Sequence, residues 1–449
     1  MDRARIILLN CGEEVYPQNR LAEMIEEVRQ GVRALDVELV SSHIVMNEKM
    51  AVEALKAIRG SEFDAIVVHL VSWHITSNVL QVLKEYKAVP VLVWATGGKT
   101  DSSGKLHSPA AQAGITALLP ALREMGYKFK AIYEKPDEAH RFSDVESFAK
   151  VARAYRRIRG SRIGLVGYAD MGLYTCTYDR TSLAAKLGID VEDYFSYDIG
   201  KLMEEVPEED IRRITDGMKR DLVFENEVSE KVLDKVACLY HVLKHRAGER
   251  GLDAISIKCV YGVTRYMGVN PCMAQSLLAN RDLSVICECD AHGLITNMML
   301  SMLTGQTSAF MENYEFYEDE ILVGTCGFLP FDFAEKPVKV RSANLGDFFV
   351  GLSNVSQVKT GMVTFARLYK TGDSYRMFLS KGEARPPVKW IELGWEEPTP
   401  DFPSMLLKLS MPVQEYLEKV PGQHIICVYG DHVEQMKDLC RLLDIEVVL

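Results

Sequence analysis

The sequence has no uninterrupted apolar run of about 18 residues, which is the length that a membrane-spanning helix needs. Its first apolar run, Arg5–Leu9, is too short for the core of a signal peptide and predicts a buried strand instead. Basic residues are also few, with 52 Lys and Arg against 63 Asp and Glu and a net charge of −11. Without a basic excess to neutralise phosphates, a general nucleic-acid-binding role is disfavoured.

Several motifs are absent as well. The ten cysteines form no C-x-x-C pair, which argues against a zinc knuckle. No G-x-G-x-x-G or Walker pattern is present, and neither G-x-S-x-G nor H-E-x-x-H occurs. A disulfide framework is disfavoured in a chain of 449 residues without a signal peptide. The cysteines are therefore interpreted as buried, reduced thiols, and a cytoplasmic location is predicted.

What the chain does contain is an alternation of short apolar runs and helical stretches. Strands at Ala65–Val71 and Val89–Trp94, for example, flank a helix at Ser77–Tyr86. This alternation indicates a parallel, doubly wound sheet. The expected fold class is α/β, with two Rossmann- or flavodoxin-like domains followed by an antiparallel, barrel-like β domain. The domains are predicted at 1–160, 161–335 and 336–449, and the central one is expected to carry two metal-binding carboxylates.

The evidence for the third domain is a change of pattern after residue 335. Short strand-like runs at Gly361–Tyr369, Tyr375–Lys381 and Val388–Glu392 are separated by Gly, Pro and Asp, as in antiparallel hairpins. The chain then returns to a strand at His424–Tyr429 and a helix at Val433–Leu443.

Two glutamates are the first candidates for chemistry. Glu288 lies near the end of the predicted strand Leu283–Cys289, and Glu312 follows the strand Ser308–Met311 by one residue, 24 positions later. Parallel strands joined by a crossover helix end at the same edge of a sheet, so the two carboxylates should face each other. Such a pair repels unless a positive charge separates it, and a divalent cation is the simplest partner.

A third ligand is left open at this point. His292, His424 and His432 are all candidates, and each also fits an ordinary role at a helix start or strand end. Trp73 and His74 follow a predicted strand, where an aromatic side chain either stacks on a sugar or caps the core.

Four segments resemble the L-fucose isomerase / L-arabinose isomerase superfamily. The segment Phe310-Met311-Glu312-Asn313-Tyr314 resembles the F-M-E-D-Y segment, and Pro421-Gly422-Gln423-His424 resembles G-G-x-H-H. The segments that begin at Val71 and Ala169 resemble W-M-H-T and G-D-N-M. The resemblance implies Glu288, Glu312 and His424 as metal ligands, with Glu288 and Glu312 catalytic, and favours His424 over His432. It further implies that the substrate is bound by Trp73, His74 and Met171.

Two departures from the family pattern stand out. Cys326 occupies the place where arabinose isomerases carry a second metal-binding histidine, and Glu312 stands where the fucose isomerase branch has aspartate. Cys287 and Cys289 alternate with Glu288 on the predicted strand, so they should point to the opposite side and not act as ligands.

The resemblance implies a metal-dependent aldose–ketose isomerase that acts on a free sugar, which includes deoxy- and sulfo-sugars, through a cis-enediol. Mn²⁺ is the expected ion, with Mg²⁺ and Co²⁺ as alternatives. A homo-oligomer is implied, with a hexamer among the candidates. No membrane or nucleic-acid partner is expected. Two other functions stay open at this point: a metal-dependent sugar aldolase or epimerase, and a non-catalytic sugar-binding protein.

Overall fold

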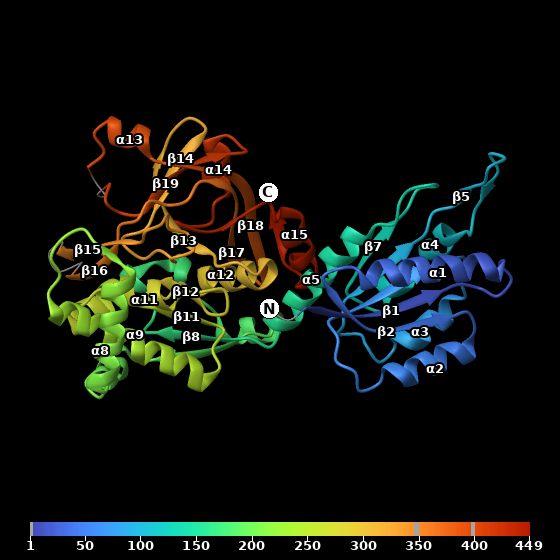
Figure 1. Ribbon diagram of the computed structural model, residues 1–449, viewed down its shortest axis with the longest axis horizontal. Helices are drawn as coiled ribbons and strands as arrows, with labels where there is room; N and C mark the ends of the chain where they lie inside the picture. The colour runs from blue at the N-terminus through green and yellow to red at the C-terminus, as the bar shows by residue number, and fades with distance from the viewer. Residues whose placement is uncertain (1–2, 345–349, 397–399) are drawn as a thin grey trace. The chain divides into compact units, whose positions relative to one another are not determined.

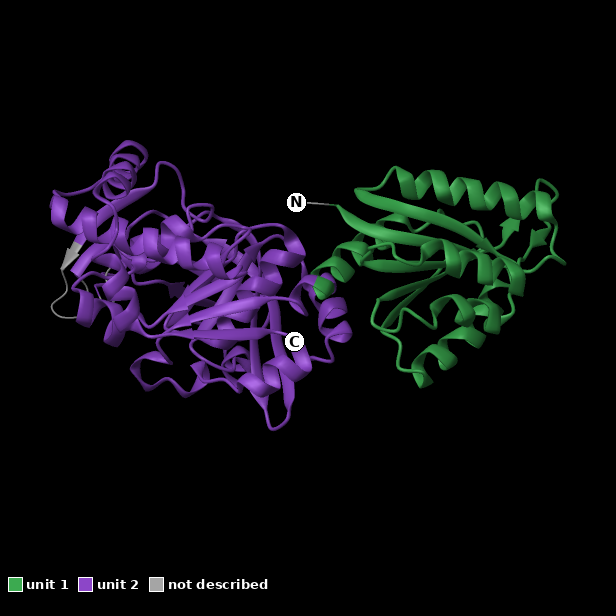
Figure 2. Ribbon diagram, turned by 90° about the horizontal axis from the view of Figure 1, so that it is seen from below, with its two compact units in different colours: residues 1–156 green, residues 157–449 purple. Residues whose placement is uncertain are grey.

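The chain divides into two compact units in the computed structural model, Met1–Arg156 and Arg157–Leu449 (Figure 2). The structure describes residues 3–344, 350–396 and 400–449. Among the helices of these described residues, none has both the length and the apolar character needed to cross a membrane. The division into three domains stays a prediction.

Unit 1 is built on one parallel sheet. Its five strands follow the order β2-β1-β3-β4-β7, and every pairing is parallel. The strands are β1 (Ala4–Cys11), β2 (Val37–Val45), β3 (Ala65–Leu70), β4 (Val91–Ala95) and β7 (Phe129–Tyr133). A short hairpin, β5 (Lys99–Thr100) and β6 (Leu106–His107), follows β4.

Helices cover both faces of this sheet (Figure 1). They are α1 (Gln18–Arg33), α2 (Glu48–Ile58), α3 (Thr76–Leu83), α4 (Ala111–Glu124) and α5 (Phe142–Ile158). One buried core joins α1 and α5 to the sheet, and a second joins α2, α3 and α4 to it. Unit 1 is therefore doubly wound, as the alternation of apolar runs predicts. In such sheets, ligands bind beyond the carboxyl ends of the strands.

Unit 2 begins with a second parallel sheet, ordered β12-β11-β8-β9. Its strands are β8 (Arg162–Val166), β9 (Asp190–Tyr194), β11 (Ala254–Ile257) and β12 (Ser284–Cys287). The helices of this part are α6 (Arg180–Ser182), α7 (Ser196–Met203), α8 (Glu208–Asp221), α9 (Glu230–Arg250), α10 (Arg265–Met267), α11 (Cys272–Leu278) and α12 (Ala291–Thr304). Irregular helical turns are η1 (Asp170–Gly172), η2 (Tyr174–Cys176), η3 (Leu183–Leu187) and η4 (Cys259–Thr264).

The rest of unit 2 is a closed antiparallel barrel of six strands, ordered β17-β20-β13-β14-β19-β18, in which β18 pairs back with β17. The strands are β13 (Ala309–Phe316), β14 (Glu320–Gly324), β17 (Gly361–Thr371), β18 (Ser374–Arg385), β19 (Ser404–Leu409) and β20 (His424–Tyr429). Smaller elements are β10 (Val223–Phe224), β15 (Lys339–Asn344), β16 (Val350–Asn354), β21 (Glu446–Val448), α13 (Val388–Glu392), α14 (Val413–Lys419) and α15 (Val433–Leu442). Closure leaves the six strands without free edges.

Helix α12 connects the two layers of unit 2. It contacts β11 and β12 of the parallel sheet and β17 and β20 of the barrel. Its side chains are buried all around the helix from Ala291 to Leu303. A helix that is buried on every side lies inside a protein, and this one is enclosed by a sheet on one side and a barrel on the other.

Two local predictions are wrong. The run Val388–Glu392 is helix α13 instead of a strand, starting directly after two prolines. The strand that presents Glu288 ends at Cys287, so Glu288 and Cys289 lie beyond it, and the predicted alternation of side chains does not hold there. Period-two patterns cannot mark where the ladder stops, because that depends on the neighbouring strand.

The expected arrangement of the two glutamates within one sheet is also wrong. Strand β12 belongs to the parallel sheet, whereas β13 is an antiparallel strand of the barrel that continues past Glu312 to Phe316. The carboxylates therefore do not sit at one edge of a common sheet. Helix α12 carries the chain from one layer to the other, and the candidate site forms where the two layers meet.

Candidate active site

The backbone at Glu288 has an unusual conformation. Glu288 has a φ of 67° and Cys289 a φ of 50°, both in the left-handed region that non-glycine residues rarely adopt. The turn is held on both sides: the Asp170 amide donates to the Glu288 carbonyl at 3.1 Å, and the Cys289 thiol donates to the Val166 carbonyl at 3.0 Å. Strain of this kind persists where the surrounding structure imposes it, often at functional sites. Here it turns the chain directly after β12.

His424 is brought to Glu288 by the barrel. It is the first residue of β20 and is fully buried, and its Nε2 lies 3.1 Å from Glu288 Oε2. In the ladder between β13 and β20, His424 is the direct partner of Glu312. Residues directly opposite in an antiparallel pair are close neighbours, with Cβ atoms about 5 Å apart. The structure thus brings together the three residues predicted as metal ligands.

Asp290 is the functional residue that the motif analysis missed. Its Oδ2 lies 2.8 Å from His424 Nδ1, and its Oδ1 accepts from the Gly293 amide at 2.9 Å as the N-cap of α12. The Arg367 guanidinium pairs with both carboxylate oxygens, and both side chains are almost fully buried. A carboxylate on one imidazole nitrogen fixes the ring orientation and leaves the other nitrogen for a ligand. Asp290 therefore directs His424 Nε2 toward Glu288.

The electrostatics of the three ligand candidates are strongly coupled. Burial and the nearby charge of Glu288 raise the pKa of Glu312 to about 7. Burial alone would lower the pKa of His424, but Asp290, Cys176 and Glu288 together raise it well above its ordinary value. Two carboxylates and an imidazole that prefers to be cationic form a site in which a positive charge is strongly favoured. A divalent cation can supply that charge in place of the proton.

The titration of Glu312 leads to a testable prediction for the metal-free protein. Its folded-state pKa of about 7 lies above the ordinary 4.5, so the folded state binds this proton more tightly than the unfolded state does. The resulting stabilisation is complete below about pH 4.5 and is lost as the pH rises through about 7. Urea unfolding in the presence of a chelator should show this fall, and Glu312→Gln should flatten it.

The exposed residue Glu318 offers a matched control for that measurement. The variant Glu318→Gln should retain the pH dependence of the unmodified protein. An unchanged slope in Glu312→Gln would contradict the prediction.

Another group of metal-binding residue types overlaps this site. Among the described residues, ligand atoms of Cys176, Asp290 and His424 lie within 4.8 Å of one another. Asp290 is already paired with the Arg367 guanidinium, which repels a cation, and it also caps α12. The face of His424 that carries Nε2 and meets Glu288 is therefore the better place for a metal ion.

The other cysteines and histidines near the motifs have partners elsewhere. Cys287 donates to Gln275 Oε1 at 3.3 Å. A hydrogen bond with Cys272 and burial raise the pKa of Cys326 well above its usual range, which keeps this thiol protonated. His432 bonds within its own turn, with Nδ1 at 3.0 Å from Gln435 and Nε2 at 3.0 Å from the Tyr429 carbonyl. These contacts favour His424 as the histidine ligand.

The predicted substrate-binding residues are divided between the units. Met171 lies in η1 of unit 2, is 38% exposed and has a φ of 47°. Trp73 and His74 follow β3 in unit 1, where Trp73 is 40% exposed and His74 is buried. Neither ring nitrogen of His74 has a hydrogen-bond partner among the described residues, and burial lowers its pKa to about 4. Substrate binding by these three residues stays a prediction.

Comparison with known proteins shows which family of enzymes this chain is similar to. The family model of the fucose/sulfoquinovose isomerase N-terminal domain matches residues 13–159. This part of the chain is therefore similar to the fucose isomerase-like family. A sulfoquinovose isomerase of Priestia aryabhattai is 22% identical over 398 residues, which cover 87% of this chain and 86% of that protein. A sulfoquinovose isomerase of Alkalicoccus urumqiensis is 22% identical over 394 residues, 86% of each chain.

These similarities confirm two predictions from the motifs. The resemblance to fucose isomerase is confirmed, and so is the enzyme class, since the chain is an aldose–ketose isomerase. The match covers most of the length of both chains.

Proposed function

We propose that this isomerase converts a sulfonated hexose between its aldose and ketose forms with the help of a divalent metal ion. The observation that carries the proposal is the approach of His424 Nε2 to Glu288 Oε2 at 3.1 Å, with Glu312 opposite His424 in the ladder. The substrate class is taken from the relatives named sulfoquinovose isomerase.

The residues at the site fit a metal ion. Glu288 Oε2 belongs to a buried carboxylate, and His424 Nε2 at 3.1 Å is the positive group beside it. A histidine that binds a metal ion is neutral, so the two buried carboxylates would then need another positive charge, which a cation would supply. Two carboxylates and one imidazole suit Mn²⁺ or Mg²⁺ better than a thiolate zinc site. When bound, the ion would act as a Lewis acid on adjacent oxygens of the sugar.

The glutamates and the residues that hold His424 have different roles in the proposed proton transfer. Isomerisation moves a proton between C2 and C1 through a cis-enediol, so the site needs a group that accepts a proton and then returns it. Glu312, the direct partner of His424 in the ladder between β13 and β20, is assigned both steps. Glu288, with Oε2 at 3.1 Å from His424 Nε2, provides a second carboxylate. Asp290 and Arg367 hold His424 in place and do not exchange protons with the sugar.

A panel of aldoses tests the proposal directly. With Mn²⁺ present, sulfoquinovose should be converted to its ketose faster than glucose, fucose or arabinose. In D₂O the product should carry deuterium at C1 or C2, as proton transfer through an enediol requires. Cleavage into two fragments would show an aldolase instead, and binding without conversion would show a sugar-binding protein. Either result would contradict the proposal.

Metal removal is expected to stop the reaction. Dialysis against a chelator should reduce isomerisation by about 100-fold or more, because the Lewis acid is lost together with the charge that separates the two glutamates. Addition of Mn²⁺ should restore the rate, and Mg²⁺ and Co²⁺ should be tested in parallel. The rate is measured as ketose formed per unit time. Full activity in the metal-free protein would show that the carboxylates work without an ion.

The remaining expectations from the sequence are part of the proposal as well. A homo-oligomer is expected, and sedimentation or light scattering of the purified chain would measure its size.

Trp73 and His74 of unit 1 are expected to contact the sugar, so Trp73→Ala should raise KM more than it lowers kcat.

A further inference from the structure

Unit 1 contains a groove that the proposed isomerisation does not use. Its volume is about 540 Å³, and it lies between the N-terminal half of α1 and the β5–β6 hairpin. Apolar side chains of Tyr16, Leu21 and Leu106 share its walls with charged groups. Pockets of about 300–1,000 Å³ with a few polar groups on an apolar wall commonly bind small molecules. His140 lies at the inner end, with a side chain only 3% exposed.

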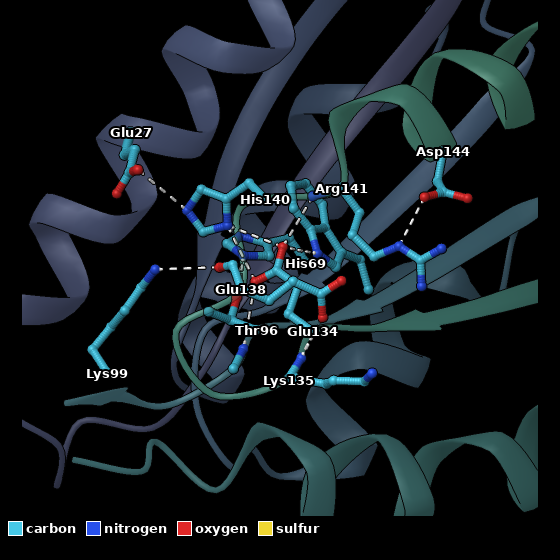
Figure 3. A network of polar contacts seen from close by, with 12 residues as sticks. Glu27, His69, Thr96, Lys99, Glu134, Lys135, Glu138, His140, Arg141 and Asp144 are labelled. Atoms are coloured by element: carbon cyan, nitrogen blue, oxygen red, sulfur yellow. Dashed lines mark hydrogen bonds and ion pairs between the residues drawn. The ribbon is translucent and has the colours of Figure 1, made fainter. Parts of the chain in front are cut away.

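The buried carboxylate of Glu134 binds one ring nitrogen of His140. Glu134, the residue after β7, is 1% exposed and accepts hydrogen bonds from Trp94 Nε1 at 2.8 Å and the Arg141 amide at 3.2 Å (Figure 3). His140 Nδ1 lies 3.0 Å from Glu134 Oε1. The hydrogen bond to Glu134 raises the pKa of His140, and the pKa of Glu134 is lowered by His140 in spite of its burial. The contact between Glu134 and His140 therefore favours the imidazolium form of His140.

The other ring nitrogen of His140 has no hydrogen-bond partner in the part of the chain that the structure describes. Its Nε2 is buried and unpartnered among the described residues, and Glu27 Oε1 lies 3.6 Å away (Figure 3). Glu27 is on α1 and is 64% exposed, so its carboxylate is mostly in solvent and too distant to accept a hydrogen bond. A buried cationic N–H without an acceptor is costly, and an oxygen from outside would relieve that cost.

Further charges line the same groove. Arg20 and Lys99 both border it. In the described part of the chain, Arg20 makes no ion pair, and Lys99 Nζ only approaches the Glu138 carbonyl at 3.5 Å. Glu23 and Glu27 on α1 also line the groove, so the lining is not uniformly positive. Such a mixture suits a ligand with one acidic group and several hydroxyl groups, because hydroxyls both donate and accept hydrogen bonds.

We propose that this groove binds a monosaccharide-sized, polyhydroxylated anion, one oxygen of which accepts a hydrogen bond from His140 Nε2 in place of the contact with Glu27. Lys99 and Arg20 neutralise the rest of the acidic group. The ligand class covers carboxylates, sulfonates and phosphates of small sugars. None of the residues proposed for the isomerisation lines this groove, so the inference goes beyond the proposed function and does not depend on it.

Calorimetric titration of the full chain tests the proposal. The protein carries Glu288→Gln and is free of metal, so that no sugar is converted during the titration. The probes are gluconate, glucose 6-phosphate and sulfoquinovose, with glucose as the uncharged comparison. At least one anionic probe should bind at one site per chain, about tenfold or more tightly than glucose, since a charge-assisted hydrogen bond contributes that much.

Three variants give the signature of this groove. Lys99→Ala should weaken binding by about threefold to tenfold, because it removes a charge from a solvent-exposed site. Glu27→Gln should tighten binding, because the ligand no longer displaces a carboxylate. Glu26→Gln, on the same helix but outside the groove, should leave the affinity unchanged. Ligand addition should also shift the nitrogen-15 resonance of His140 Nε2.

Several outcomes would overturn the proposal. One is the absence of binding by all three anionic probes. Another is weaker binding in Glu27→Gln, which would show that the Glu27–His140–Glu134 contacts serve stability alone. Loss of binding on addition of His424→Ala would place the ligand at the isomerase site. His140→Gln is the direct variant; if it does not fold, Glu27→Gln and Lys99→Ala still decide the question.

Discussion

Glu288→Gln is expected to lower kcat/KM for isomerisation by about 10²- to 10⁴-fold, the range that a positioned acid–base group contributes. The amide keeps the shape of the side chain but removes its charge. It therefore binds a metal ion less well and accepts no proton. The variant should fold normally, since the repulsion between Glu288 and Glu312 that raises the pKa of Glu312 also disappears. The rate is measured with the best aldose of the panel at saturating Mn²⁺.

A control for this variant lies on the strand that carries the second glutamate. Glu315 is on β13, three residues after Glu312, and is exposed. The variant Glu315→Gln should retain the full rate. His424→Ala should be as inactive as Glu288→Gln, because both remove a ligand from one site. Full activity in either variant would rule out the assignment of the site.

Asp290→Ala is expected to give the largest loss of stability, about 3–5 kcal/mol, because it leaves the buried Arg367 guanidinium without its partner. It also removes the N-cap of α12, which contributes about 1 kcal/mol by itself. Isomerisation should fall as well, since the ring of His424 is no longer oriented. The loss of stability is measured by urea unfolding, and the activity is measured below the unfolding transition.

A double variant separates the effect of the Asp290–Arg367 ion pair on stability from the effect of Asp290 on the orientation of His424. Replacement of both buried groups, Asp290→Asn with Arg367→Met, removes the uncompensated charge and should recover most of the stability. The activity should stay low, because the neutral amide introduced by Asp290→Asn would not orient the imidazole ring of His424 as firmly as a carboxylate does. Asp319→Ala breaks only an exposed pair with Lys408 and should change little. An Asp290→Ala protein that unfolds at the same urea concentration as the unmodified chain would contradict the argument.

Much of unit 1 can be predicted from sequence alone. The strand expected at Ala65–Val71 is β3 (Ala65–Leu70), and the apolar residues of α1 expected on one face, Leu21, Ile25 and Val28, are buried. These predictions succeed because they depend on local periodicity, and a strand buried on both faces is apolar throughout. The candidate ligands Glu288, Glu312 and His424 were found from short motifs, which are local in the same sense.

The wrong predictions concern properties that no local pattern carries. The two glutamates were expected on one sheet, since a strand, a helix and a strand usually form a parallel unit. In this chain β13 pairs with β20, more than 100 residues away, and becomes part of a barrel. Pairing over such distances depends on which edges are available, and hydrophobic periodicity contains no information about that choice.

The role of Asp290 is another feature that local sequence patterns do not encode. In the sequence it is an acidic residue before a helix, an ordinary N-cap. Its partners Arg367 and His424 are 77 and 134 residues away. Only the folded chain shows that these three groups share one buried position, where burial strengthens their interaction and raises the cost of leaving any of them unpaired.

The sequence by itself determined the layered α/β character of the chain, the candidate ligand residues and the similarity to the fucose isomerase-like family, because local periodicity and short motifs encode all three. The tertiary structure decided how the site is assembled. It placed Glu288 in a left-handed turn, brought Glu312 opposite His424 and oriented His424 through Asp290 and Arg367. The physical reason is that burial and charge pairing are properties of neighbours in space, and these neighbours are far apart in the chain.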